Sequence, residues 1–384
     1  MANQYGPWAT LMNAGGSPQL STFWKRRMTR LVSASETSPV LSRRNLLWLG
    51  AAGAVTSMVP TVRLATVMAE EAKTADTEQK ASSGRIFVAA VWRTGKGGPE
   101  NDKGGVIAID PETAQWEKII DGVGAVRVSP DGKFLAHYKL LSIGSLSRRV
   151  PTDIWAYDLS TGRQASMGKE IGVVTWSPDA TEIIVSRSRM DRKDEKSPGA
   201  TWRVARDGSK RTRMPIPETD EVDDWSRDGA WLVTVSDRHE TSSVGYQLYR
   251  MRPDGSRALR LTQEGRNVHP RFSPDSRRIV YSRDYWMSKS DAHELHVMDV
   301  GGGNDHVVLR SEGLEDFEEA CWSPDGRRLA VIWTTWQMKD GQKVRRVGEP
   351  SRFRIEIMDA DGTNRRELKL PNATMLQLFD PDWR

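Results

Sequence analysis

The chain has 384 residues, with 56 Lys and Arg, 51 Asp and Glu, and a formal net charge of +5 at neutral pH. The first 69 residues hold seven of the basic residues and one acidic residue, so the remainder has 49 basic and 50 acidic residues and a net charge of −1. This near-neutral remainder gives no electrostatic basis for nucleic-acid binding. A single cysteine, Cys321, excludes a framework of intrachain disulfides.

The first segment has the features of an export leader. Residues 42–47, Ser-Arg-Arg-Asn-Leu-Leu, open an apolar stretch that ends near residue 59. The small-residue pattern Val67-Met68-Ala69 then precedes Glu70. This arrangement resembles a twin-arginine export signal and implies a periplasmic or extracellular protein.

An apolar run of about fourteen residues is short for a bilayer span, which needs roughly twenty. We therefore favour cleavage of the leader, with no membrane span in the mature chain, over a signal anchor that tethers the protein. The expected organisation is a leader over residues 1–69, a short linker over 70–83 and a globular part over 84–384. Both Met1 and Met28 remain possible starts.

A turn motif recurs six times in the globular part. Its first residues are 48, 49, 47, 50 and 57 positions apart. The six copies are Ser129-Pro130-Asp131-Gly132, Ser177-Pro178-Asp179, Ser226-Arg227-Asp228-Gly229, Ser273-Pro274-Asp275, Ser323-Pro324-Asp325-Gly326 and Asp380-Pro381-Asp382. A period near fifty residues predicts one supersecondary unit repeated around a ring.

Each repeat predicts four antiparallel strands, which is one blade of a β-propeller. Residues 84–120 supply three strands of a blade without its innermost strand, and residues 376–382 supply an innermost strand alone. If these two ends pair, the ring closes without an open sheet edge. The predicted fold class is therefore all-β, a six-bladed propeller with one blade made from both ends of the chain.

The repeats resemble the WD40-like repeats of TolB-type six-bladed propellers over residues 84–384. The resemblance lies in the turn motif and in the pairs Met298-Asp299, Met358-Asp359 and Leu261-Thr262. It implies the propeller fold but no single activity, because such blades occur in binding proteins, peptidase propeller domains and polysaccharide lyases. No Gly-x-Ser-x-Gly elbow of a hydrolase is present in the sequence.

The candidate ligand-binding residues lie on innermost strands or in long loops. The turns that follow the innermost strands are tight, whereas the connections at the opposite end are long and varied, as expected for a binding face. Polar side chains on three consecutive innermost strands, and aromatic side chains near the long loops, give the predicted set: Asp223, Asp224, His269, Arg271, Glu318, Glu319, Trp286 and Trp336. The alternatives are polar residues that only solvate the channel and aromatic rings buried beneath the loops.

The sequence predicts no metal site, no cofactor and no catalytic residues. His293 and His296 are three positions apart on an expected strand, so they point to opposite faces. The run from Asp359 to Gly362 is interpreted as a hairpin turn because it lacks the further carboxylates of a calcium loop.

These observations favour an exported, non-catalytic, monomeric propeller that binds a protein, a peptide or a cell-envelope glycan through its loop-rich face. The alternative is a propeller enzyme, such as a polysaccharide lyase or hydrolase, acting at the central channel.

Overall fold

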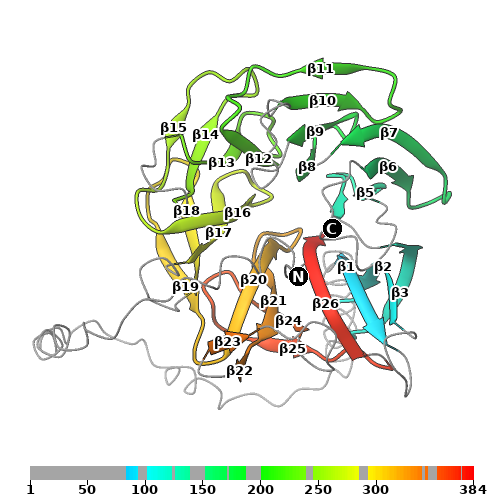
Figure 1. The fold of residues 1–384 in the computed structure, drawn as a ribbon, viewed down its shortest axis with the longest axis vertical. Helices are drawn as coiled ribbons and strands as arrows, with labels where there is room; N and C mark the ends of the chain where they lie inside the picture. The colour runs from blue at the N-terminus through cyan, green and yellow to red at the C-terminus, as the bar shows by residue number, and fades with distance from the viewer. Residues whose placement is uncertain are drawn as a thin grey trace, which may run out of the picture. The chain divides into compact units, whose positions relative to one another are not determined.

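The computed structural model describes residues 84–93, 102–122, 126–138, 152–170, 173–186, 200–238, 245–284, 293–339, 342–344, 353–372 and 374–384. They form strands and turns and contain no helix. Six four-stranded antiparallel sheets surround a central axis (Figure 1). The six-bladed all-β propeller expected from the repeats is confirmed. The leader, the linker and Trp286 lie outside the described residues.

Three blades come from the first part of the ring and from the seam that closes it. The seam blade has the strand order β26 (Thr374–Trp383), β1 (Ile86–Arg93), β2 (Asp102–Ile109) and β3 (Trp116–Asp121). The next blade runs β4 (Val126–Val128), β5 (Phe134–Tyr138), β6 (Thr152–Asp158) and β7 (Gln164–Glu170). The third blade contains β8 (Val173–Trp176), β9 (Glu182–Ser186), β10 (Thr201–Ala205) and β11 (Arg211–Arg213).

The other three blades follow in chain order. The fourth is β12 (Asp220–Trp225), β13 (Leu232–Ser236), β14 (Gln247–Met251) and β15 (Leu259–Arg260). The fifth is β16 (Arg266–Phe272), β17 (Arg278–Asp284), β18 (His293–Asp299) and β19 (His306–Arg310). The sixth is β20 (Glu315–Trp322), β21 (Arg328–Thr335), β24 (Phe353–Asp359) and β25 (Arg366–Leu368), and the hairpin β22 (Gln337–Lys339) and β23 (Gln342–Val344) interrupts it.

The repeated turn motif is held by the same hydrogen bonds in successive blades. In the first copy, the Gly132 amide donates to the Ser129 carbonyl at 2.9 Å, and the Ser129 hydroxyl donates to the Asp131 carboxylate at 2.6 Å. Ala180 and Ser276 stand where other copies have glycine, and both adopt the left-handed backbone region, at φ of 57° and 60°. The motif therefore fixes the ends of the five innermost strands that a serine-initiated copy follows.

The sixth copy of the motif is not a turn, which corrects the sequence interpretation. Asp380, Pro381 and Asp382 lie inside β26, where Asp380 has a φ of 53° and the register shifts against β1. Trp383 pairs with Ile86 as Trp322 pairs with Leu329 in the preceding blade. We call the last residue before the turn the aromatic position; on the other innermost strands it is Val128, Trp176, Trp225, Phe272 and Trp322. In this blade Trp383 occupies it, rather than Phe379, which precedes Asp380-Pro381-Asp382. The joining of the two ends into one blade is confirmed.

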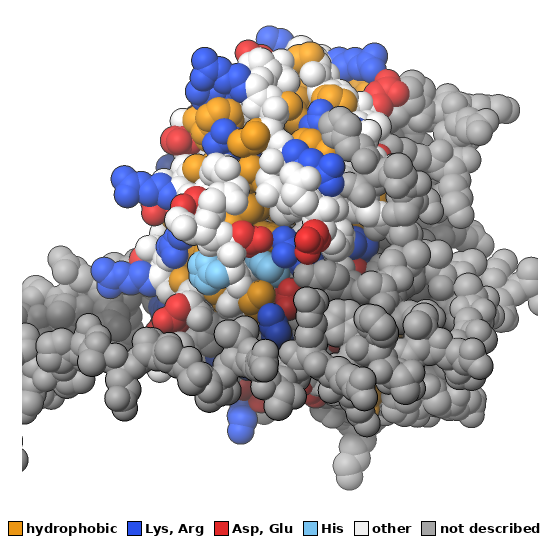
Figure 2. Space-filling model, turned by 90° about the vertical axis from the view of Figure 1, so that its left-hand side faces the viewer, with side chains coloured by type: hydrophobic (Ala, Val, Ile, Leu, Met, Phe, Trp, Pro, Cys, Tyr) orange, Lys and Arg blue, Asp and Glu red, His pale blue; other side chains and the backbone are white. Residues whose placement is uncertain are grey.

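The innermost strands contact one another around the whole ring, in the order β26, β4, β8, β12, β16, β20 and back to β26. Large side chains fill the space between neighbouring sheets, and Trp176, Trp322 and Trp383 are each at most 4% exposed. On the outer side of the ring basic and acidic side chains are interspersed (Figure 2). Leu259 is the single exposed large hydrophobic residue of the described part.

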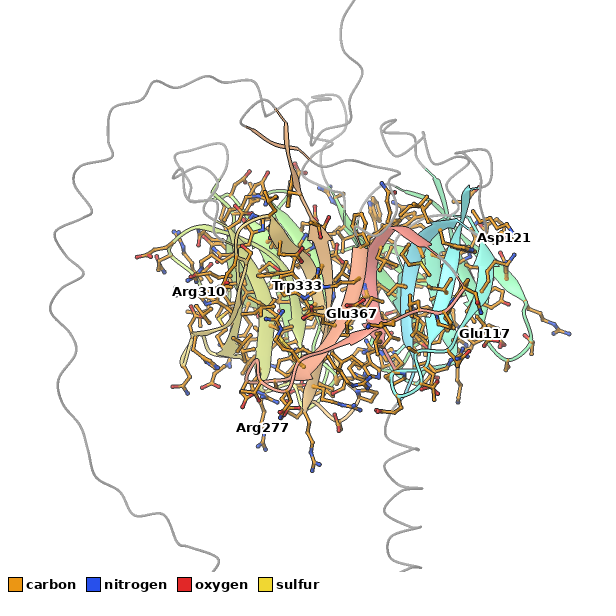
Figure 3. All side chains as sticks on the ribbon, turned by 90° about the horizontal axis from the view of Figure 1, so that it is seen from below. Glu117, Asp121, Arg277, Arg310, Trp333 and Glu367 are labelled. Carbon is orange, nitrogen blue, oxygen red and sulfur yellow. The ribbon has the colours of Figure 1, made fainter. Side chains whose placement is uncertain are left out.

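The ring has two distinct ends (Figure 3). Arg277 marks the end that carries the tight turns, and Asp121, at the end of β3, lies toward the other. We call the first the tight-turn end and the second the loop-rich end. Each innermost strand runs from the loop-rich end to the tight-turn end.

Candidate functional site

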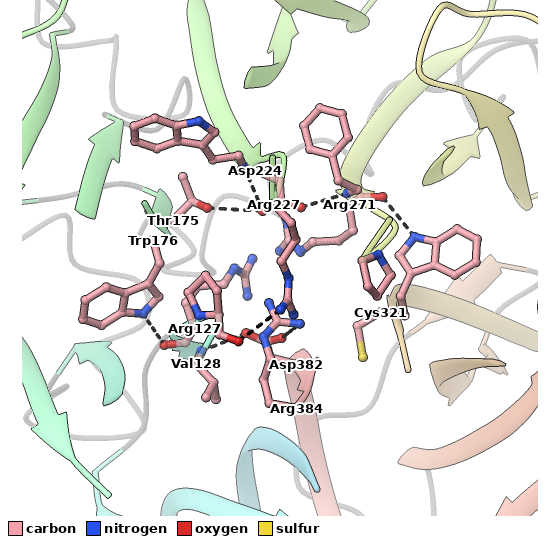
Figure 4. A pocket seen from close by; sticks show the side chains of 15 residues that line it. Arg127, Val128, Thr175, Trp176, Asp224, Arg227, Arg271, Cys321, Asp382 and Arg384 are labelled. Atoms are coloured by element: carbon pink, nitrogen blue, oxygen red, sulfur yellow. Dashed lines mark hydrogen bonds and ion pairs between the residues drawn. The ribbon is translucent and has the colours of Figure 1, made fainter. Parts of the chain in front are cut away.

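A pocket occupies the tight-turn end of the central channel (Figure 4). It is open to solvent. The turn residues Pro130, Arg227 and Pro274 border it, and residues from all six innermost strands, together with Arg384, line the rest. We call this space the channel pocket.

The residue just before the aromatic position of each innermost strand forms a ring around the channel pocket. In order, these residues are Arg127, Thr175, Asp224, Arg271, Cys321 and Asp382. The ring therefore shows Arg, a small residue and Asp, and then the same pattern again. The propeller has an approximate two-fold repeat of three blades at this level.

The hydrogen bonds of the ring repeat in the same way. Asp382 accepts from the Val128 amide at 2.8 Å, and Asp224 accepts from the Phe272 amide at 2.8 Å. The indole of Trp176 donates to the Arg127 carbonyl, and that of Trp322 donates to the Arg271 carbonyl. Each aspartate thus ties its strand to the next blade. Burial raises the pKa of Asp224, although amide hydrogen bonds from Phe272 and Trp225 oppose the rise.

Two arginines of the channel pocket are paired with carboxylates. The Arg127 guanidinium lies 2.9 Å from the Asp380 carboxylate, and the Arg384 guanidinium lies 3.0 Å from the Asp382 carboxylate. Burial disfavours the charge of Arg127, but Asp380, Asp382 and further carboxylates raise its pKa above the ordinary value. These two guanidinium groups are electrically compensated.

The other two arginines have only carbonyl partners. Arg271 is 8% exposed and donates to the carbonyls of Asp223 and Pro270, each at 3.0 Å. Arg227 stands where the other four serine-initiated turns have proline, and it donates across the channel to the Pro130 carbonyl at 3.0 Å. Burial and the charge of Arg384 lower the pKa of Arg227 to about 10, and the more distant carboxylates of Asp382 and Asp224 offset only part of this effect. No carboxylate of the described residues lies within 4.0 Å of either guanidinium.

Comparison with known proteins places this chain in a family. The family model described as the TolB beta propeller domain matches residues 123–366. The chain belongs to this family. No curated protein matches this chain significantly. The matched region spans most of the described ring, from just before β4 to the start of β25.

Several solved structures are similar to this chain. A protein assigned as TolB from Agrobacterium tumefaciens is 19% identical, with a TM-score of 0.50, over 77% of this chain and 91% of that chain. A nidogen/laminin complex is 13% identical, with a TM-score of 0.46, over 78% and 94%. An oligogalacturonate lyase from Vibrio parahaemolyticus is 10% identical, with a TM-score of 0.45, over 73% and 78%. At these identities the likeness concerns the fold alone.

The structure separates the predicted site residues of this TolB-type propeller. Asp224 and Arg271 line the channel pocket at the tight-turn end. Asp223 is buried beside them, and its carbonyl accepts from Arg271. His269 and Glu319 lie deeper in the channel, with 3.6 Å between His269 Nδ1 and Glu319 Oε1.

The pair of His269 and Glu319 belongs to a second charged group, next to the channel pocket. The Glu319 carboxylate accepts from the Asp380 amide at 2.9 Å. Burial raises the pKa of Glu319, and the nearby Asp380 carboxylate adds to this effect. His269 adopts a φ of 54°, as Asp380 does at 53°, and both residues interrupt the pairing of an innermost strand.

Trp336 lies at the loop-rich end and is partly exposed. Its indole donates to Asp316 at 3.1 Å, and the other oxygen of Asp316 lies 2.9 Å from His293 Nδ1. The His293 pKa is raised because Asp316 outweighs the opposing effect of burial. The backbone of Glu318 forms part of β20. Trp336, Asp316 and His293 form a polar cluster that joins the fifth and sixth blades, and we call it the rim cluster.

Sequence reasoning missed Arg127, Arg227 and Asp382, which line the channel pocket. Arg227 carried a usable signal, because it replaces the proline of its turn motif. The expected strand and the expected turn are confirmed: His293 to Asp299 is a strand, and the Gly362 amide donates to the Asp359 carbonyl in a turn. Among the described residues, no group of three or more His, Cys, Asp or Glu is arranged to hold a metal ion.

The described residues also contain no helix long and apolar enough to span a membrane. Cys321 is 2% exposed, and burial raises the pKa of its thiol. With two compensated and two uncompensated guanidinium groups, the channel pocket has the chemistry to hold an anionic group.

Proposed function

We propose that this TolB-type propeller is an exported, non-catalytic binding protein that engages a protein, a peptide or a glycan of the cell envelope through its loop-rich end. Export is inferred from the twin-arginine pattern of the leader. The mature chain is proposed to act as a monomer in the periplasm or outside the cell.

The observation that carries the proposal is the rim cluster. A partly exposed tryptophan is held by a carboxylate that also contacts a histidine from the neighbouring blade. Such an indole is positioned before any partner arrives, so little conformational entropy is lost on binding. Tryptophan is also among the residue types that contribute most to protein interfaces.

The hydrogen bonds of the channel acids support a binding role over catalysis. Asp224 and Asp382 accept from main-chain amides of the next blade, and Glu319 accepts from the Asp380 amide. These carboxylates are therefore occupied in joining strands. A general acid or base needs a free path to a reacting group.

The test is a pull-down from envelope extract with the full chain and two tryptophan variants. Trp336→Ala removes the indole of the rim cluster. Trp202→Ala is the matched control, because Trp202 is also partly exposed but lies on β10, in a different blade. We expect one partner to be retained by the wild type and by Trp202→Ala, and to be lost with Trp336→Ala. Equal capture by both variants would contradict the proposal.

A further inference from the structure

We propose that the channel pocket binds an oxyanion, the carboxylate or phosphate group of a ligand, between Arg227 and Arg271. This site is at the opposite end of the ring from the rim cluster. It therefore does not depend on the function proposed above.

Arginines outnumber carboxylates in the lining of the channel pocket. Its side chains include four arginines, Arg127, Arg227, Arg271 and Arg384, and two aspartates, Asp224 and Asp382. Asp380, just outside, compensates Arg127, and Asp382 compensates Arg384. Burial of a charge without an opposite charge is costly. Arg271 is buried and Arg227 is half-buried, and among the described residues neither has a carboxylate within 4.0 Å. The two guanidinium groups therefore indicate a place for an external anion.

The approximate two-fold repeat of the residues around the channel pocket is broken at the two arginines Arg127 and Arg271. Asp380 lies three residues before Trp383, and it is the carboxylate that pairs with Arg127. The equivalent residue before Trp225 is Val222, which is fully buried in an apolar cluster. Arg271 therefore lacks the partner that Arg127 has. Its guanidinium bonds the Asp223 carbonyl instead.

Arg227 is the second arginine of the channel pocket that has no carboxylate within 4.0 Å among the described residues. Its side chain crosses the mouth of the channel pocket, where it meets the repulsion of Arg384. Figure 4 shows the guanidinium groups of Arg127, Arg227, Arg271 and Arg384 turned toward the middle of the pocket. An anion placed there would remove the repulsion and supply the missing opposite charge.

The channel pocket also contains guanidinium N–H groups that make no hydrogen bond among the described residues. The buried Nε atoms of Arg127 and Arg384 have no hydrogen-bond acceptor among the described residues. A buried N–H group without an acceptor is unfavourable, and a bound oxygen would satisfy it. The forked guanidinium group matches two oxygens at once, which favours a carboxylate or phosphate over a halide.

Binding can be measured by calorimetry on the full chain at constant ionic strength, in a buffer free of both probes. One arm uses inorganic phosphate and the other uses succinate, so that the two sources of the oxyanion are distinguished. We expect saturable binding of at least one probe with one site per chain, accompanied by a rise in Tm.

Three variants locate the binding. Arg271→Gln removes one uncompensated charge, and Arg227→Pro removes the other while restoring the proline of the four related turns. Arg277→Gln is the control, because Arg277 is exposed at the same end of the ring and does not line the pocket. We expect binding to weaken about 10- to 100-fold in the first two variants, as for loss of a charge-assisted hydrogen bond, and to be unchanged in the control.

The binding measurements decide the proposal in either direction. Failure of the wild type to bind either probe, or undiminished binding by Arg227→Pro and Arg271→Gln, would overturn the proposal. If Arg271→Gln does not fold, Arg227→Pro alone decides, because proline is compatible with this turn. Capture of the partner at the rim cluster should be unaffected by Arg227→Pro, which separates the two proposals.

Discussion

The two halves of the channel ring carry the same pattern but different charge. One half presents Arg127, Thr175 and Asp224, and the other presents Arg271, Cys321 and Asp382. The aspartates and tryptophans make equivalent hydrogen bonds in both halves. Among the described side chains, Arg127 has a carboxylate within 4.0 Å and Arg271 has none. A scaffold can therefore be kept constant while one neighbouring residue decides whether a buried charge is structural or available to a ligand.

The largest expected difference between the halves concerns the arginines. Arg127→Met leaves Asp380 without its cation, and we expect a loss of about 3 kcal/mol in the free energy of unfolding. Arg271→Met strands no carboxylate, and two lost bonds to carbonyls are offset by relief of a buried charge, so we expect a change of about 1 kcal/mol or less. Denaturant unfolding in anion-poor buffer measures both. Equal losses would show that the halves are energetically alike.

A second comparison uses the aspartates. Asp382→Asn removes an ion pair with Arg384 at the seam, with an expected loss of about 2 kcal/mol, the range for hydrogen bonds to charged groups. Asp224→Asn removes no ion pair within 4.0 Å among the described residues, and we expect a loss of about 1 kcal/mol or less. Unfolding curves of the two variants, recorded side by side, check the order. A larger loss in Asp224→Asn would contradict it.

The pH dependence sharpens the role of Asp224. Its pKa is raised in the folded state, so the folded protein binds this proton more tightly than the unfolded chain. The contribution of Asp224 to stability is therefore present at low pH and is lost as the pH rises from the unfolded pKa through the folded pKa. Arg384 and Arg127 face this carboxylate and limit the rise.

Asp224→Asn should abolish that dependence. The difference in unfolding free energy between the variant and the wild type is expected to shift in favour of the variant as the pH increases across this window. Asp158, whose pKa is lowered to about 2, has the opposite sign and cancels in the difference. A difference that does not change with pH would show that Asp224 titrates normally.

The smallest expected effect is that of Arg227→Pro on stability. Proline matches the four related turns and restricts the unfolded chain, so we expect a gain of about 0.4–1 kcal/mol in the absence of anion. Thermal unfolding with and without phosphate tests this. A loss of stability without anion would mean that the bond from Arg227 to Pro130 outweighs the entropic gain.

Much of the fold could be predicted because its turns are local in sequence. The Ser-Pro-Asp-Gly motif defines its own hydrogen bonds within six residues, so five turns and their strands followed from the residues alone. Asp380-Pro381-Asp382 has the composition of a turn but lies in a strand. Its conformation depends on pairing with β1, almost 300 residues earlier in the sequence. Trp383 was the available signal, since it continues the aromatic series.

The candidate site was less predictable, because pairing across the ring is not visible in a repeat. The sequence singled out Asp224 and Arg271 as unusual polar residues on innermost strands. It did not indicate that Asp380 lies beside Arg127, 253 residues away in sequence, or that nothing equivalent lies beside Arg271. Those facts depend on which blades adjoin and on the register at the seam.

The seam also has a consequence for the order of folding. Strands β2 to β25 can pair with neighbours close in sequence, but β1 must wait for β26 before its inner edge is covered. During synthesis this edge stays exposed until nearly the whole described chain has been made, and closing so long a loop is entropically unfavourable. A circular permutant that links residues 384 and 84 directly and opens between two other blades would turn the most distant pairing into a local hairpin. It should therefore reach the closed ring faster than the natural order of strands does.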